Sequence, residues 1–285
     1  MSRQADARFA SRRPAPPLRP YVDRYVGYRL DGVADAVHRG LPSRHLTMIS
    51  SIGAPIEVLA QADPAQRPDV FDFVVAGLQV TPALIAADGP QEGVTIELTP
   101  FGCRALLGMP PLALWNCAVE ADAVIGRAAT ELHHRLHETP RWADRFAECD
   151  EVLSRLLRAE PPAVDERLRG AWQLLVASGG RIAVSDLADR IGWSRRHLAQ
   201  RFTGEFGLSP KAAARVLRFE RACALLRSAC RPAIADVALT CGYYDQPHLN
   251  RDFAALAGCP PAAWLATELP FVQDSDGAPR ADSPA

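Results

Sequence analysis

Two short polar clusters in the C-terminal third of the chain carry side chains that can hydrogen-bond to nucleic-acid bases. Arginine pairs with guanine through two parallel hydrogen bonds, and asparagine or glutamine pairs in the same way with adenine. The spacing within each cluster would bring its members to one face of a helix. The residues are Arg195, Arg196 and Gln200 in the first cluster, and Gln246, Asn250 and Arg251 in the second.

Both clusters lie within an internal duplication. The residues repeated at an offset of 50 are Leu187, Ala188 and Gly192, which match Val237, Ala238 and Gly242. The residues repeated at an offset of 51 are His197, Leu198, Phe202, Gly207 and Pro210, which match His248, Leu249, Phe253, Gly258 and Pro261. Because apolar residues and glycines recur together, we expect two copies of one supersecondary unit of about 25 residues.

Each copy has the pattern of a helix-turn-helix unit, with capping residues where helices should begin and glycines where they should end. In the first copy the expected features are an N-cap at Ser185, a helix over 185–191, a C-cap at Gly192, an N-cap at Ser194 and a helix over 195–206 ended by Gly207. In the second copy they are a helix over 234–241, a C-cap at Gly242, an N-cap at Asp245 and a helix over 246–257 ended by Gly258. The second helix of each unit has a polar face that can enter a major groove. The alternative is a helical hairpin whose polar face meets only water.

Residues 210–229 are expected to form one long helix between the units. About 18 helical residues span ~27 Å, which suits two helices in successive major grooves about 34 Å apart. Residues 194–231 hold nine basic and two acidic side chains, although the whole chain has a net charge of −1. This excess favours a polyanionic partner, with solvated or ion-paired arginines as the alternative. The candidates for phosphate contacts are Arg201, Lys211, Arg215, Arg218 and Arg221.

Residues 165–268 resemble the DNA-binding domain of AraC/XylS-type transcription regulators. The residues that carry the resemblance are Ile182, Leu187, Ala188, Gly192, Ser194, His197, Leu198, Phe202, Gly207, Ser209, Pro210, Arg218, Ala222, Leu225, Leu226, Ile234, Val237, Ala238, Gly242, Tyr243, Asp245, Leu249, Arg251, Phe253, Gly258 and Pro260. The resemblance implies double-stranded DNA as the partner, bound at an operator with two half-sites in successive major grooves. Gln200 departs from the family's usual arginine in the first unit, and Thr203 and Ala254 stand where the family often has lysine.

The first part of the chain is expected to form an α+β domain over residues 21–160. Apolar runs separated by Gly, Pro and Asp turns predict five to seven short antiparallel strands. Two amphipathic helices within 125–157 form a helical hairpin that would cover this sheet or join a second subunit in a homodimer. The expected fold is therefore an α+β N-terminal domain followed by an all-α domain of two helix-turn-helix units joined by a long helix.

Three segments between His38 and Pro111 resemble an uncharacterised domain often found before AraC-type domains in high-GC bacteria. The resemblance implies a sensing or dimerising role and identifies no ligand. Residues 1–20 are rich in Arg, Pro and Ala and are expected to be a disordered arm, and residues 271–285 a disordered tail.

The other reactive residues indicate no catalytic site, cofactor or metal centre. The sequence has no phosphate loop, nucleophile elbow or dinucleotide-binding fingerprint, so we expect no enzyme. His38 and His45 lack an H-x-H pattern, and the zinc-compatible i, i+4 pair His133 and His137 lacks a third ligand. A polar loop and a solvated helix face are therefore favoured. Cys103 beside an arginine is a minor candidate for redox sensing.

The sequence therefore predicts a cytoplasmic, sequence-specific DNA-binding transcription regulator. No apolar run is long enough to span a membrane, and the N-terminus has no secretory pattern. The expected partners are operator DNA, a small-molecule effector of unknown identity acting on the N-terminal domain, and RNA polymerase. Two alternatives stay open: a ligand-independent dimeric regulator, and an enzyme or ligand-binding domain with a vestigial DNA-binding module.

Overall fold

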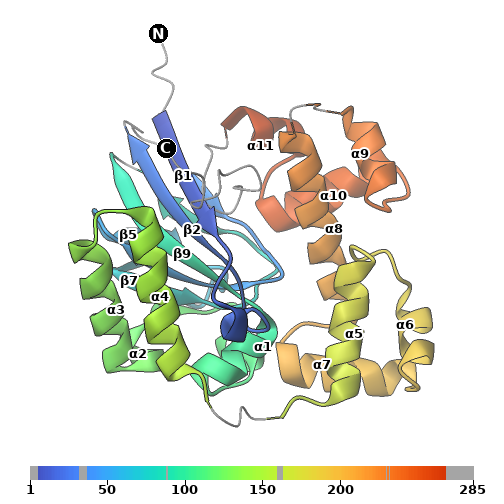
Figure 1. Ribbon diagram of the computed structural model, residues 1–285. Helices are drawn as coiled ribbons and strands as arrows, with labels where there is room; N and C mark the ends of the chain where they lie inside the picture. Colours follow the sequence, from blue (N-terminus) through green and yellow to red (C-terminus); the bar gives the residue numbers. More distant parts are fainter. Residues whose placement is uncertain are drawn as a thin grey trace.

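A computed structural model of the chain describes residues 6–31, 37–87, 89–158, 163–228, 230 and 232–267. A β-rich N-terminal half and a helical C-terminal half lie side by side (Figure 1). The N-terminal half contains antiparallel strands and a helical hairpin, and the C-terminal half contains two helix-turn-helix units joined by a long helix, which confirms the expected fold class. Within the described ranges, no helix is long and apolar enough to cross a membrane.

Two antiparallel sheets form the N-terminal half. The larger has the strand order β1-β2-β9-β4-β7-β10, and the smaller has the order β3-β8-β5-β6. Eight strands, β2 to β9, lie where the apolar runs predict five to seven, and the run over 71–80 divides at Asp72 between β6 and β7. The strands are β1 (Asp6–Arg12), β2 (Val22–Asp31), β3 (Val37–Gly40), β4 (Leu46–Ser51), β5 (Ile56–Ala60), β6 (Asp69–Phe71), β7 (Phe73–Ala76), β8 (Ala83–Ala86), β9 (Gln91–Leu98) and β10 (Ala118–Glu120).

The expectation of a disordered arm over residues 1–20 is wrong for its described part. β1 pairs antiparallel with β2 along its whole length, and Leu18, in the short 3-10 helix η1 (Pro16–Leu18), is fully buried. The Arg12 side chain donates a hydrogen bond to the Phe146 carbonyl at 2.8 Å and pairs with Asp150. Backbone pairing and these contacts order a segment that its Arg-, Pro- and Ala-rich composition does not mark as a strand. Residues 1–5 and the expected tail, 271–285, lie outside the described residues.

A helical hairpin, α3 (Arg127–Glu138) and α4 (Trp142–Leu156), covers one face of the larger sheet (Figure 1). Its apolar stripes are buried within the chain, and Gly27 in β2 leaves room for the Trp142 ring, which would lie 2.3 Å from a Cβ at that position. The sequence left open whether these stripes cover the sheet or join a second subunit. In the structure these stripes pack on the sheet, and a homodimer through the 125–157 helices stays a prediction. The stripe residues are Ala129, Leu132, Leu136, Phe146, Cys149, Val152 and Leu153.

Short helical segments follow β9 and flank β10. They are α1 (Pro100–Gly102), the π-helix η2 (Cys103–Leu107), the 3-10 helix η3 (Pro111–Leu114) and α2 (Asp122–Ile125). The helical half consists of α5 (Glu166–Ala177), α6 (Val184–Arg190), α7 (Arg195–Phe206), α8 (Pro210–Arg227), α9 (Ile234–Thr240), α10 (Gln246–Ala257) and α11 (Pro261–Thr267). The buried residues of the first helix-turn-helix unit belong to the same core as those of the larger sheet, whereas the second unit has a separate core around Phe219, Phe253 and Trp264.

Candidate nucleic-acid interface

The first helix-turn-helix unit consists of α6, a turn and α7. The Ser194 hydroxyl accepts a hydrogen bond from the backbone N–H of His197 at 3.2 Å and so caps α7. Gly192 in the turn and Gly207 after α7 have φ angles of 70° and 83°, a region that favours glycine. These features agree with the sequence expectation. The expected N-cap at Ser185 is wrong, because α6 already begins at Val184 and has no side-chain cap.

The second unit, α9 and α10, repeats this geometry. The Asp245 carboxylate accepts a hydrogen bond from the His248 backbone N–H at 2.8 Å and so caps α10. Gly242 and Gly258 have φ angles of 82° and 72°. An aromatic contact is also repeated: the Trp193 ring lies edge-on to His197 in the first unit, and Tyr243 lies edge-on to His248 in the second. The duplication in sequence is therefore a duplication of caps, turns and ring packing.

The candidate base-reading residues lie mainly on exposed faces of α7 and α10. Each helix buries its apolar side, including Leu198 and Phe202 in α7 and Leu249 and Phe253 in α10. Asn250 is half-buried, and its Oδ1 atom has no hydrogen-bond partner among the described residues. The exposed candidates are Arg195, Arg196, Gln200, Gln246 and Arg251. The two helices thus each present polar side chains to solvent from the N-terminal part of the helix, the geometry of groove reading.

The candidate phosphate contacts divide into exposed and internally paired residues. Lys211 and Arg201 are exposed, and Arg201 lies 3.4 Å from Asp165. The Arg215 side chain instead donates a hydrogen bond to Asp252 at 3.0 Å, which joins α8 to α10.

Arg218 and Arg221 are both half-buried on α8. Arg218 donates a hydrogen bond to the Gly180 carbonyl at 2.9 Å and lies over the Tyr243 ring. Arg221 lines a pocket that faces the N-terminal half. Arg218 and Arg221 are therefore partly enclosed by the protein, whereas Lys211 is exposed to solvent.

The N-terminal half holds the end of α7 through contacts that sequence reasoning missed. The Arg104 guanidinium, in η2, donates hydrogen bonds of 2.6 and 2.7 Å to the two carboxylate oxygens of Glu205. The Phe101 and Phe206 rings meet edge to face at 6.2 Å. Trp115 lies against Gly207 so closely that a Cβ there would be 2.8 Å from the Trp115 side chain. The first unit is therefore fixed to the sheet domain close to its candidate reading helix.

A pocket of about 380 Å³ lies between the two halves. Its walls come from β2, the segment before β4, β9, the end of α5 and one side of α8. Across it, the backbone N–H of Arg44 donates a hydrogen bond to Glu220 on α8 at 3.2 Å. This volume is within the range of small-molecule binding sites.

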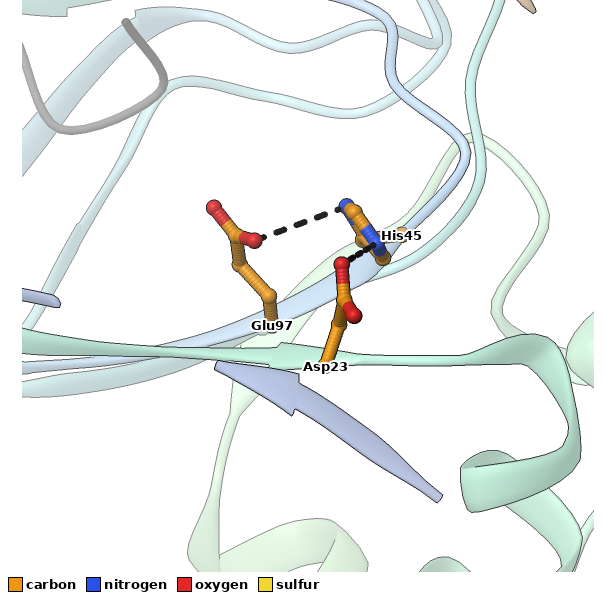
Figure 2. Close-up of side chains that lie close together, drawn as sticks. All are labelled: Asp23, His45 and Glu97. Atoms are coloured by element: carbon orange, nitrogen blue, oxygen red, sulfur yellow. Dashed lines mark ion pairs between the residues drawn. The ribbon is translucent and has the colours of Figure 1, made fainter. Parts of the chain in front are cut away.

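Asp23, His45 and Glu97 converge beside this pocket from three neighbouring segments of the sheet (Figure 2). The His45 Nε2 atom lies 3.1 Å from Asp23, and its Nδ1 atom lies 3.7 Å from Glu97. The hydrogen bond with His45 and the charge of Arg44 hold the pKa of Asp23 below its ordinary value. Arg24 donates to both oxygens of Glu97 at 3.0 Å. Because each carboxylate already faces a cation and the two ring nitrogens face different acids, the geometry is that of a charge network rather than of a metal centre.

The other sequence candidates are in less reactive surroundings. His133 is half-buried, with its Nδ1 atom 2.9 Å from the Ser50 hydroxyl, whereas His137 is exposed. The expected solvated face is therefore correct for His137 and wrong for His133, which packs on the sheet. Burial raises the pKa of the Cys103 thiol to about 12, and a protonated thiol is a poor redox sensor.

Two domain families match separate parts of the chain. Residues 187–267 match the family described as a helix-turn-helix domain. The C-terminal region is an AraC-type helix-turn-helix domain. Residues 10–120 match a domain of unknown function (DUF6597), which agrees with the resemblance seen in the sequence. Upstream of its AraC-type domain, the chain therefore carries a recognised but functionally undefined domain.

The proteins to which the chain is similar include two bacterial regulators. An uncharacterized HTH-type transcriptional regulator of Bacillus subtilis, YbfI, is 34% identical over 68 residues, which are 24% of each chain, so the match spans about a quarter of this relative's length. ToxT from Vibrio cholerae O395 has a similar structure, with a TM-score of 0.52, 12% identity and coverage of 92% of this chain and 99% of ToxT. ToxT bound to an unsaturated fatty acid, from strain SCE256, gives a TM-score of 0.52 at 10% identity over 95% and 99% of the two chains. At such identities the ToxT likeness shows the fold alone. The structural match extends over both the sheet domain and the helical domain.

Proposed function

We propose that this chain is a sequence-specific DNA-binding transcription regulator whose α7 and α10 read successive major grooves. The observation that carries the proposal is the pair of exposed polar helix faces, each accompanied by the same cap, turn and edge-on ring contact. The AraC-type domain match and the basic stretch around α8 support it. Such a regulator acts on the chromosome in the cytoplasm and changes transcription through RNA polymerase.

We further propose that a small molecule controls the DNA-bound state. An effector changes DNA affinity only if it binds two arrangements of the protein unequally. The pocket between the halves is suited to this, because its walls belong to the sheet domain and to α8. The structures of ToxT with a fatty acid and with (E)-4-(8-methylnaphthalen-1-yl)but-3-enoic acid support ligand control in this architecture. The open pocket favours this function over a ligand-independent regulator.

The experiment is selection of genomic DNA fragments by the full-length protein at about 0.15 M salt, where weak phosphate-driven binding is suppressed. We expect one enriched motif with two half-sites about 10 bp apart. Arg127→Ala, which removes an exposed arginine on α3, should select the same motif. Enrichment no greater than for random DNA would contradict sequence-specific recognition.

A further inference from the structure

The pocket between the two halves carries more positive than negative charge. Its lining includes four arginines and two glutamates, a formal excess of two positive charges. A partly enclosed site with this balance favours an anionic ligand, because field lines concentrate where low-dielectric walls surround the charge. The charged residues are Arg24, Arg44, Arg221, Arg227, Glu97 and Glu220.

Arg221 stands outside the ion pairs that engage Arg24 and Arg44. Arg24 is engaged by both oxygens of Glu97. Arg44 lies 3.4 Å from Asp23 and 4.0 Å from Glu220. Arg221 has no ion-pair partner in the part of the chain that the structure describes, and it lines the pocket from α8. A ligand carboxylate beside Arg221 would supply the missing charge.

One carboxylate oxygen of Glu220 has no hydrogen-bond donor among the described residues. Its Oε1 atom accepts the Arg44 backbone N–H, but its Oε2 atom has no hydrogen-bond partner among the described residues. Burial raises the pKa of Glu220, and the charge of Arg44 only partly opposes this effect. The Thr95 hydroxyl, on the opposite wall, also has no described partner. Since unsatisfied buried polar atoms cost free energy, the pocket favours a ligand with a hydrogen-bond donor.

We propose that this pocket binds a small carboxylic acid that also carries a hydroxyl or amino group. The carboxylate pairs with Arg221, the donor group satisfies Glu220, and an apolar body lies against Leu41, Leu217 and Phe219. The inference rests on the proposed function, because it names the class of the effector. Such a ligand would touch both halves of the chain and bias their arrangement, as an effector must.

The test is thermal unfolding of the full-length protein, without DNA, with probes that share one apolar body. The phenyl set is 3-phenyllactate, phenylalanine, 3-phenylpropanoate and phenethylamine, and the indole set is indole-3-lactate, tryptophan, indole-3-propanoate and tryptamine. At about 10 mM, we expect a hydroxy or amino acid of at least one set to raise Tm by a few degrees. The donor-free acid and the amine of the same set should give a smaller rise or none. No rise with any acid, or an equal rise with the donor-free acid, would overturn the proposal.

Two variants assign the roles of the residues. Arg221→Ala should abolish the rise in Tm with every acid, whereas Arg127→Ala, an exposed arginine on α3, should keep it. Glu220→Gln should keep the response to the acids but lose the preference for those with a donor, and it provides a second readout if Arg221→Ala unfolds. Unchanged responses in both pocket variants would overturn the assignment. Ligand binding without DNA enrichment would contradict only the proposed function, and enrichment without ligand binding would contradict only this inference.

Discussion

The Arg104 guanidinium and the Glu205 carboxylate meet across the interface between the two halves, with nitrogen–oxygen distances of 2.6 and 2.7 Å. Glu205 is in the last turn of α7 and is almost fully buried. Arg104→Ala should lower the free energy of unfolding by about 2 kcal/mol, because the carboxylate would stay buried without its charged donor. Urea denaturation measures this change. Arg127→Ala, the exposed control, should change stability by less than about 0.5 kcal/mol, and an equal effect of the two variants would show that the pair anchors nothing.

Gly180, just after α5, and Gly192, in the turn of the first unit, separate steric crowding from backbone strain. Both have positive φ angles, 72° and 70°, but a Cβ on Gly180 would lie 2.2 Å from the Ala214 carbonyl oxygen, whereas a Cβ on Gly192 would meet open space. We expect Gly192→Ala to cost about 1 kcal/mol from strain alone, and Gly180→Ala to cost about 3 kcal/mol or more. Denaturation midpoints of the two variants give the comparison. Equal costs would mean that α8 does not pack closely on the end of α5.

Lys211 and Arg218 test which basic residues of α8 contact phosphates. Lys211 is exposed at the start of α8, whereas Arg218 donates its hydrogen bond to the Gly180 carbonyl. Lys211→Ala should weaken binding to all DNA sequences alike and reduce the slope of log K against log salt by about 1, with little change in Tm. Arg218→Ala should lower Tm. The reverse pattern, an Arg218→Ala protein with an unchanged Tm and a reduced salt slope, would show that Arg218 contacts a DNA phosphate.

The Asp23 carboxylate should make the stability of the sheet domain depend on pH. Its pKa is below the ordinary value because of the hydrogen bond with His45 and the charge of Arg44. A lowered folded-state pKa stabilises the fold above the unfolded-state value of about 3.9, and this stability is lost as the pH falls toward the folded-state pKa. Asp23→Asn should therefore lower Tm at neutral pH, and its difference from the wild type should shrink at about pH 3. A constant difference in Tm at both pH values would exclude this contribution.

The helix-turn-helix units could be predicted from the sequence because their signals are local. Ser194 and Asp245 are capping residues a few positions from the backbone groups they cap, and glycines stand where the chain needs a positive φ angle. The duplication strengthens the prediction of each helix boundary, because the same capping residues and glycines recur in both copies. The expected start of α6 is wrong, because Ser185 follows the first helical residue instead of preceding it, and α6, α8 and α9 end one or two residues before the expected positions.

The contacts between the halves could not be predicted, because their partners are far apart in sequence. Arg104 and Glu205 are 101 positions apart, and neither has a local pattern that marks it as paired. The cluster of Asp23, His45 and Glu97 depends on the register of β2 and β9 and on the segment entering β4, which strand propensity does not determine. β1 could not be predicted either, because it is ordered by contacts with residues distant in sequence. These are its pairing with β2 and the contacts of Arg12 with α4.

Two-groove recognition is tested most directly by selecting DNA with two single variants. Arg196→Ala alters the exposed face of α7, and Arg251→Ala alters that of α10. We predict that each variant loses base preference in one half-site only, that the two affected half-sites differ, and that their centres lie about 10 bp apart. If both variants select the wild-type motif, or both lose preference at the same positions, α7 and α10 do not read separate grooves.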